Sequence, residues 1–137
     1  MYSRENIEAA DTVYMVMTDR FFDGDPSNNG TPGAEYQPRN LHFYQGGDWT
    51  GLRRKLPYIK ELGFSAVWMS PPQDNELYSR TGDEAGYHGY YTRDFNSPNP
   101  HFGTAEELRA LHREAERLGI KMILDVQLNH TADYLAY

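Results

Sequence analysis

The sequence contains no cysteine, which excludes a disulfide scaffold, a thiolate zinc site and a thiol nucleophile. No apolar run approaches the ~18 residues that a membrane-spanning helix needs, and residues 1–10 lack the pattern of a secretory signal peptide. Basic residues are few: 13 Lys and Arg stand against 20 Asp and Glu, a formal net charge of −7. Because nucleic acids and anionic membranes attract basic surfaces, neither is an expected partner.

The composition is that of one compact domain. Its 137 residues are 39 % hydrophobic and 24 % charged, which excludes a disordered or collagen-like chain. Aromatic residues make up 14 %, with 11 tyrosines and 2 tryptophans. These rings have an apolar face and a polar edge, which suits the binding of sugars. Core filling is the other explanation for any single ring.

Three short apolar runs predict buried β-strands. They cover 12–18, 65–69 and 120–126 and do not alternate with polar residues, which is typical of parallel strands buried on both faces. Between them, apolar residues recur at helical spacing over 50–62 and over 104–118. The order strand, helix, strand, helix, strand predicts an α/β sheet with right-handed crossovers.

The two helices have recognisable terminal residues. Thr104 and Glu107 form a capping box, and Gly63 and Gly119 stand where C-terminal caps belong. Pro57 either kinks the first helix or begins its second piece, because it has no N–H to donate.

Long loops without periodicity follow the first and second strands. They cover 19–48 and 70–103 and are rich in Gly, Pro, Asn, Asp and Tyr. Both leave the carboxyl ends of parallel strands, the edge where α/β proteins place their functional sites. Loops of this length commonly carry function.

Short motifs at these strand ends resemble those of one enzyme family. They are Thr18-Asp19-Arg20-Phe21, Gly46-Gly47-Asp48-Trp49, Tyr87-His88-Gly89-Tyr90, Arg93-Asp94-Phe95 and Asp125-Val126-Gln127-Leu128-Asn129-His130. In this order they resemble the N-terminal part of the catalytic barrel of the α-amylase family, glycoside hydrolase family 13. The likeness extends from Val13 to Thr131 and is nearest to the cyclodextrin glucanotransferase and maltogenic amylase branch.

The resemblance implies an α/β fold, the N-terminal portion of a (β/α)₈ TIM barrel with about three β/α units and parallel strands. Such a barrel takes roughly 250 residues, so 1–137 is interpreted as a single partial catalytic barrel domain. It also implies a retaining enzyme with a carboxylate nucleophile and a carboxylic acid about 5 Å apart. In the family these groups follow strands four and five, and a further Asp follows strand seven. No catalytic residue is therefore expected in this chain, and the segment alone is expected to be inactive.

The loop 19–48 carries a cluster of oxygen-rich side chains, the ligands that calcium prefers. Its spacing is not that of an EF-hand. The resemblance implies a first calcium site formed by Asp23, Asp25, Asn28, Asn29, the carbonyl of Gly46 and Asp48. The alternative is an Asx-rich turn whose side chains bond only their own backbone.

The implied metal chemistry departs from the family pattern at one point. Known glucanotransferases have a disulfide across this loop, and the matching positions here are Pro38 and Gln45. The loop is therefore expected to depend more on the ion. Asn129 resembles a ligand of a second calcium, whose other ligands this chain lacks. Ca²⁺ is the expected cofactor.

Three residues resemble those that, in the family, bind the sugar at the cleavage point: His88, Tyr90 and His130. Tyr90 would stack on a pyranose face, and neutral imidazoles can donate to or accept from hydroxyls. Asp125 ends a barrel strand, but the resemblance gives it a supporting role, orienting its neighbours through hydrogen bonds, rather than that of a catalytic acid.

Other polar and aromatic residues near the motifs are expected to serve the structure. Arg93 and Asp94 are interpreted as a structural ion pair, and Trp49 and Trp68 as core residues. Asp19 and Arg20 are expected to anchor the calcium loop. The histidines outside any motif are expected on the surface: His42, His101 and His112.

The leading hypothesis is the N-terminal segment of a calcium-dependent α-glucan hydrolase or glucanotransferase that acts on α-1,4 bonds of starch-like substrates. The alternative is a truncated product that binds calcium and carbohydrate without catalysis. A complete domain of unrelated function is disfavoured, because an open apolar strand edge invites aggregation. The expected partners are an α-glucan and the remaining barrel, from the same or another chain.

The missing strands should leave Val13, Val67 and Ile123 with few neighbours on the inner side. The chain alone is therefore expected to be marginally stable or to associate. The resemblance favours secretion, while substrate preference and the choice between hydrolysis and transfer stay open.

Overall fold

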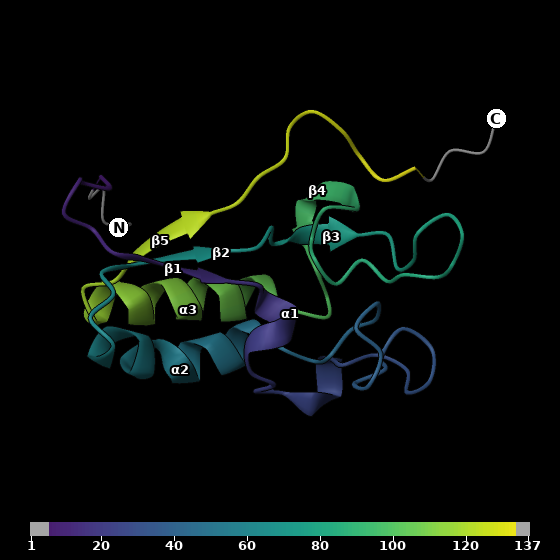
Figure 1. The fold of residues 1–137 in the computed structure, drawn as a ribbon, viewed down its shortest axis with the longest axis horizontal. Helices are drawn as coiled ribbons and strands as arrows, with labels where there is room; N and C mark the ends of the chain where they lie inside the picture. Colours follow the sequence, from purple (N-terminus) through teal and green to yellow (C-terminus); the bar gives the residue numbers. More distant parts are fainter. Residues whose placement is uncertain (1–5, 134–137) are drawn as a thin grey trace.

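The computed structural model describes residues 6–133, and its centre is a parallel sheet of three strands (Figure 1). The strands are β1 (Val13–Val16), β2 (Ala66–Met69) and β5 (Lys121–Leu124), hydrogen-bonded in the order β1-β2-β5. Each lies inside one of the apolar runs of the sequence. The predicted parallel α/β arrangement is confirmed.

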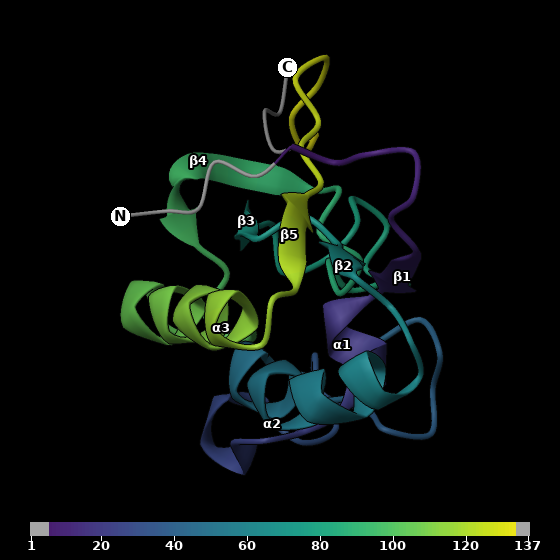
Figure 2. The same ribbon diagram turned by 90° about the vertical axis from the view of Figure 1, so that its left-hand side faces the viewer.

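Two helices cover one face of this sheet (Figure 2). They are α2 (Trp49–Glu61), between β1 and β2, and α3 (Ala105–Arg117), before β5. Their apolar stripes and one face of the strands form the core, which contains Val16, Leu52, Leu56, Ile59, Val67, Met69, Leu111 and Ala115. Within the described part of the chain, no helix has the length and apolar character to cross a bilayer.

Local side chains determine where these helices begin. Asp48 is the N-cap of α2 and accepts a hydrogen bond from the Gly51 N–H. Thr104 caps α3 by accepting from the Glu107 N–H at 3.2 Å, and the Glu107 carboxylate accepts from the Thr104 N–H at 2.7 Å. This is the predicted capping box. Pro57 lies inside α2, which continues past it as one helix.

The sheet face away from the helices is apolar and open. Successive side chains of a strand point to opposite faces, and on this face Met15 is 46 % exposed and Trp68 40 %. The expectation of a core Trp68 is therefore wrong, whereas Trp49 is fully buried in α2. The expectation for Val67 is also wrong, because it faces the helices and is buried, whereas Val13 is exposed as expected.

The connections at the carboxyl ends of the strands contain short elements. After β1 come α1 (Thr18–Phe21) and the 3₁₀ helix η1 (Pro26–Asn28). After β2, β3 (Gln73–Asn75) and β4 (Thr92–Pro98) pair antiparallel. This hairpin was not predicted, because its Asn, Asp, Ser and Pro residues have low β-propensity. Figure 1 shows these connections gathered at one end of the sheet.

Gly51 provides a test of how closely α2 approaches the loop after β1. A Cβ at this position would meet the carbonyl oxygen of Phe22 and lie 3.0 Å from the nitrogen of Gly24. Since backbone atoms would have to move, we expect G51A to lower the free energy of unfolding by about 1–3 kcal/mol. Without this contact, alanine in a helix would raise it by about 1 kcal/mol. Denaturant titration gives the sign, and a stabilised variant would contradict the close approach.

Candidate active site

Side chains from two distant parts of the sequence meet at the carboxyl ends of β2 and β5. The Tyr90 hydroxyl donates a 2.6 Å hydrogen bond to Oδ2 of Asp125. The His88 and Tyr90 rings are stacked, with centroids 5.7 Å apart and planes inclined by 20°. Nε2 of His130 lies 3.2 Å from the Tyr90 carbonyl oxygen. We refer to His88, Tyr90, Asp125 and His130 as the Tyr90 cluster.

Backbone geometry and one buried amide hold this cluster in place. Gly89 has φ +89°, a left-handed conformation that favours glycine. This turn lets the Tyr90 N–H donate to Nδ1 of His88 at 2.9 Å. The side-chain amide of Gln127 donates to the Tyr90 carbonyl at 3.0 Å and to the Thr92 hydroxyl at 2.7 Å. The segment after β5 is thereby joined to β4.

The electrostatic surroundings favour neutral groups in the cluster. The hydrogen bond to the Asp125 carboxylate, together with burial, raises the pKa of Tyr90 to about 12. Burial lowers the pKa of His88, and the nearby Arg20 cation adds to this effect, although Glu84 opposes it. At neutral pH the cluster therefore offers a phenol ring and a neutral imidazole, groups that bind hydroxyls.

Asn129 lies beside this cluster rather than within it. Its Oδ1 is 3.0 Å from Nδ1 of His130, and both side chains are exposed.

The loop after β1 contains buried oxygen atoms that lack partners. Oδ1 of Asp23, of Asn28 and of Asn29 are buried without a hydrogen bond within residues 6–133, while the Asn29 amide donates to Asp23 Oδ2 at 2.7 Å. Gly46 lies against them, since a Cβ there would be 2.7 Å from Asn29 Oδ1. Unpaired buried oxygens are costly. They are also the hard donors that bind calcium.

The other two predicted ligands have hydrogen-bond partners in the loop itself. Oδ2 of Asp48 accepts from the N–H groups of Gly24 at 3.0 Å and Asp25 at 2.7 Å, and Oδ1 caps α2. Oδ1 of Asp25 accepts from the N–H and the hydroxyl of Ser27. Burial raises the pKa of Asp48, and the Ser27 bonds lower that of Asp25. These two carboxylates therefore shape the loop whether or not they bind an ion.

The described residues contain no group of three or more His, Cys, Asp or Glu side chains that could hold a metal ion. The candidate site in the loop is of another kind, because it combines carboxylates with amide oxygens and a backbone carbonyl. Its donor set is all oxygen, which suits calcium better than zinc or another transition metal.

Asp19 anchors this loop to the sheet. It is 1 % exposed, and its carboxylate accepts from the N–H of Gln45 at 2.9 Å and of Gly46 at 3.2 Å. Its carbonyl accepts from the Gly47 N–H at 2.8 Å. Burial raises the pKa of Asp19 to about 6, although these N–H groups and Arg20, 3.0 Å away, oppose the shift.

Gln45, one of the two positions that the resemblance matched to a disulfide, holds the loop by hydrogen bonds. Its side-chain amide donates to the carbonyls of Gln37 and Asn40, each at 2.9 Å, and of Phe43 at 3.3 Å. Pro38, at the other position, is exposed. The loop is thus closed by hydrogen bonds from one amide.

The predicted ion pair between Arg93 and Asp94 is wrong. Arg93 pairs with Asp74 of β3, while Asp94 accepts from the Asn96 N–H at 2.8 Å and from the Ser97 hydroxyl at 2.7 Å. Neighbours along an extended strand point to opposite faces and do not meet. Arg93 therefore fastens β4 to β3.

The sequence did not indicate the role of His101. It was expected on the surface but is half-buried, stacked on the buried Tyr44 ring at 4.2 Å, with Nδ1 3.1 Å from the Asn28 carbonyl. His112 is also half-buried on α3. Glu35, 8 % exposed, accepts from the Thr31 N–H and is a further buried acid of the loop. No local pattern marks these residues, since their burial depends on contacts between distant segments.

Parallel β/α units with a polar and aromatic cluster at the strand ends are the architecture of β/α-barrel enzymes. The family model described as "Alpha amylase, catalytic domain" matches residues 15–137. The chain therefore belongs to the alpha-amylase family, as the motifs predicted.

Relatives with this sequence include glucanotransferases and amylases. The cyclomaltodextrin glucanotransferase of Klebsiella oxytoca is 42 % identical over 124 residues, which are 88 % of this chain and 19 % of that protein. The alpha-amylase of Streptomyces lividans is 47 % identical over 104 residues, 74 % of this chain and 11 % of that protein. The chain thus spans less than a fifth of the length of either relative.

A solved structure shows the same likeness in three dimensions. The γ-CGTase of alkalophilic Bacillus clarkii superposes with a TM-score of 0.85 at 36 % identity, over 89 % of this chain and 19 % of that chain. The three parallel strands and two helices are thus part of the fold of a much longer enzyme domain of this family.

The link between Tyr90 and Asp125 can be tested by titration. In D125N the phenol loses its carboxylate acceptor, so we expect the pKa of Tyr90 to fall from about 12 toward the ordinary value of about 10. In the native protein this bond stabilises the fold below pH ~10 and ceases to do so as the pH rises through about 12. NMR of ring-labelled tyrosine would measure the shift.

E84Q is the matched control, because Glu84 accepts from Tyr91 at 3.1 Å. It should change the titration of Tyr91 and leave that of Tyr90 in place. An unchanged Tyr90 titration in D125N would show that the two groups do not interact.

Proposed function

We propose that this chain forms the N-terminal segment of the catalytic barrel of a calcium-dependent, retaining enzyme that hydrolyses or transfers α-1,4-glucosidic bonds of starch-like glucans. The observation that carries the proposal is the Tyr90 cluster, in which a tyrosine ring, two histidines and a carboxylate meet at the carboxyl ends of β2 and β5. Relatives named cyclomaltodextrin glucanotransferase and alpha-amylase support it.

Each residue of the cluster has a role in this proposal. Tyr90 presents its ring to the apolar face of a glucose unit. His88, kept neutral by burial, and His130 bind the hydroxyls of that sugar. Asp125 orients Tyr90 through the 2.6 Å hydrogen bond and does not act as the catalytic acid. The cluster therefore binds and positions one sugar, and the reacting carboxylates are contributed by other strands.

The chemistry itself requires two more carboxyl groups. In a retaining glycosidase one carboxylate attacks the anomeric carbon and a carboxylic acid protonates the leaving oxygen, with about 5 Å between them. Hydrolysis and transfer differ only in whether water or a sugar hydroxyl then intercepts the glycosyl-enzyme. Further strands would pair with the β1 and β5 edges, and the apolar sheet face with Met15 and Trp68 would then become part of the packed barrel interior.

The first test is the coding sequence that follows the codon of Tyr137, together with an assay of the full protein on starch and maltooligosaccharides. We expect an open frame that supplies an Asp, a Glu and another Asp at later strand ends. In the active protein, Y90A should raise KM by about tenfold, because one stacking contact is lost. Y58A, an exposed position on α2, should have no such effect.

A stop codon directly after Tyr137 would overturn the enzymatic proposal and favour the alternative, a segment that binds calcium and carbohydrate. Full-length protein without activity on any α-glucan would contradict the assignment of the substrate class.

We further propose that the 19–48 loop binds one calcium ion. The oxygens left unpaired on Asp23, Asn28 and Asn29 support this, because they face inward and have no proton to accept. The carbonyl of Gly46 and the carboxylates of Asp25 and Asp48 would complete the set. The ion would neutralise the carboxylates and cross-link the loop, in place of the disulfide that the sequence lacks.

Chelation tests the ion. Calcium at about 100 times its Kd should stabilise the protein by about 2.7 kcal/mol, and a chelator should remove this gain and speed proteolysis within 23–48. N28A, which deletes one unpaired oxygen, should weaken the response. T31A is the control, because Thr31 is an exposed residue of the same loop that bonds Glu35 through its backbone N–H, which the substitution keeps. Equal proteolysis of this loop with and without chelator would refute the site.

A further inference from the structure

We propose that Arg20 is a positioning residue that joins the loop after β1 to the Tyr90 cluster. The residues proposed to bind the sugar are then held by the same interactions that hold the proposed calcium loop. This inference rests on the proposed function for its effect on sugar binding. Its structural part is independent, because it concerns contacts between segments that are far apart in the sequence.

The guanidinium of Arg20 contacts its neighbour Asp19 and two segments distant in the sequence. Its Nε is 3.0 Å from Oδ2 of Asp19. Its Nη2 donates to the carbonyl of Leu41 at 2.7 Å. Its Cζ lies 3.8 Å from the centroid of the Tyr87 ring, in the loop between β3 and β4. The side chain is 22 % exposed, so these contacts are largely shielded from water.

On one side, Arg20 leads directly to the loop that carries the buried oxygens. Asp19, its ion-pair partner, accepts from the N–H groups of Gln45 and Gly46. Gly47 packs on the same segment, because a Cβ there would meet the carbonyl oxygen of Thr18. The Gly47 N–H also donates to the Asp19 carbonyl at 2.8 Å, so this part of the loop is in direct contact with Asp19. The position of Gly46 is therefore tied to that of Arg20.

On the other side, Arg20 leads to the Tyr90 cluster. The Tyr87 ring beneath it contacts the His88 ring edge-on, with centroids 5.1 Å apart and an angle of 73°. His88 in turn accepts from the Tyr90 N–H and stacks on the Tyr90 ring. Tyr87 and His88 are adjacent in the chain, so fixing the Tyr87 ring limits how the imidazole can turn.

The choice of arginine follows from this geometry. A guanidinium is planar and directs N–H groups to separate acceptors while its face lies on an aromatic ring. Lysine could keep the charge near Tyr87, but a single ammonium cannot also replace the fork that meets Asp19 and Leu41. R20K should therefore behave between the native protein and R20M.

The chain offers a matched control for a cation over an aromatic ring. Lys55 of α2 lies 4.3 Å from the centroid of the Phe22 ring, within the loop after β1. This pair has the same kind of interaction, but it joins α2 to the loop after β1 and includes no residue of the loop between β3 and β4. K55M therefore removes a cation–π contact without touching the proposed connection.

The experiment compares R20M, R20K, Y87L and K55M in the full-length protein. Hydrogen exchange should become faster over residues 84–91 in R20M and Y87L, by about tenfold, and stay unchanged there in K55M. With maltooligosaccharides, KM should rise about threefold to thirtyfold in R20M and Y87L, with kcat changed less than about twofold. In the double variant R20M/Y87L, the increase in KM should be smaller than the product of the two single effects.

Equal rates of hydrogen exchange over residues 84–91 in R20M and in the native protein would overturn the inference. So would a KM increase in R20M/Y87L that equals the product of the increases in the two single variants. Y87L tests the same contact from the other side if R20M fails to fold. If the native full-length protein has no activity on glucans, the proposed function fails, and hydrogen exchange alone then decides whether Arg20 joins the two loops.

Discussion

The carboxyl end of the sheet depends on one buried carboxylate, that of Asp19. Burial of an ionised group is unfavourable unless hydrogen bonds and an opposite charge surround it. Here the backbone N–H groups of Gln45 and Gly46 and the guanidinium of Arg20 provide both. The loop after β1 returns to the end of that strand because its backbone N–H groups at Gln45 and Gly46 donate to this carboxylate. The two loops at this edge thus have a common attachment point.

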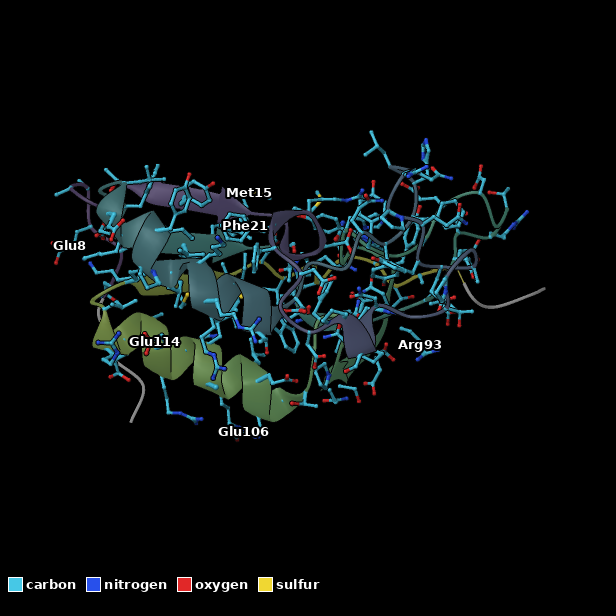
Figure 3. All side chains as sticks on the ribbon, turned by 90° about the horizontal axis from the view of Figure 1, so that it is seen from below. Glu8, Met15, Phe21, Arg93, Glu106 and Glu114 are labelled. Carbon is cyan, nitrogen blue, oxygen red and sulfur yellow. The ribbon has the colours of Figure 1, made fainter. Side chains whose placement is uncertain are left out.

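From this attachment the candidate site is built in two parts. Within residues 6–133, the loop after β1 folds around buried oxygens without hydrogen-bond partners, on which the proposed calcium site rests. The segments around β4 and after β5 bring an aromatic ring and two imidazoles together. Figure 3 shows the molecule from below, with Phe21 of α1, Arg93 of β4 and, on α3, Glu106 and Glu114 labelled. The site side chains lie at the strand ends and the ion pairs of α3 lie on the outer surface.

Local features of the sequence predicted local features of the fold well. The apolar runs contain β1, β2 and β5, and the predicted capping box at Thr104 begins α3. Three predictions that depended on distant contacts were wrong. Trp68 points away from the helices, Arg93 pairs with Asp74, and His101 stacks on Tyr44. These contacts could not be predicted from the sequence, because each depends on which distant segments meet in the fold.

The sequence by itself determined the parallel α/β class, the helix boundaries and the family, because burial periodicity, capping and short motifs are properties of neighbouring residues. Only the tertiary structure decided which predicted residues meet. It joined Tyr90 to Asp125 and Arg20 to Tyr87, and it left oxygens of Asp23, Asn28 and Asn29 without partners. The reason is physical: parallel strands bring their carboxyl ends to one edge, where loops far apart in sequence must share the same space.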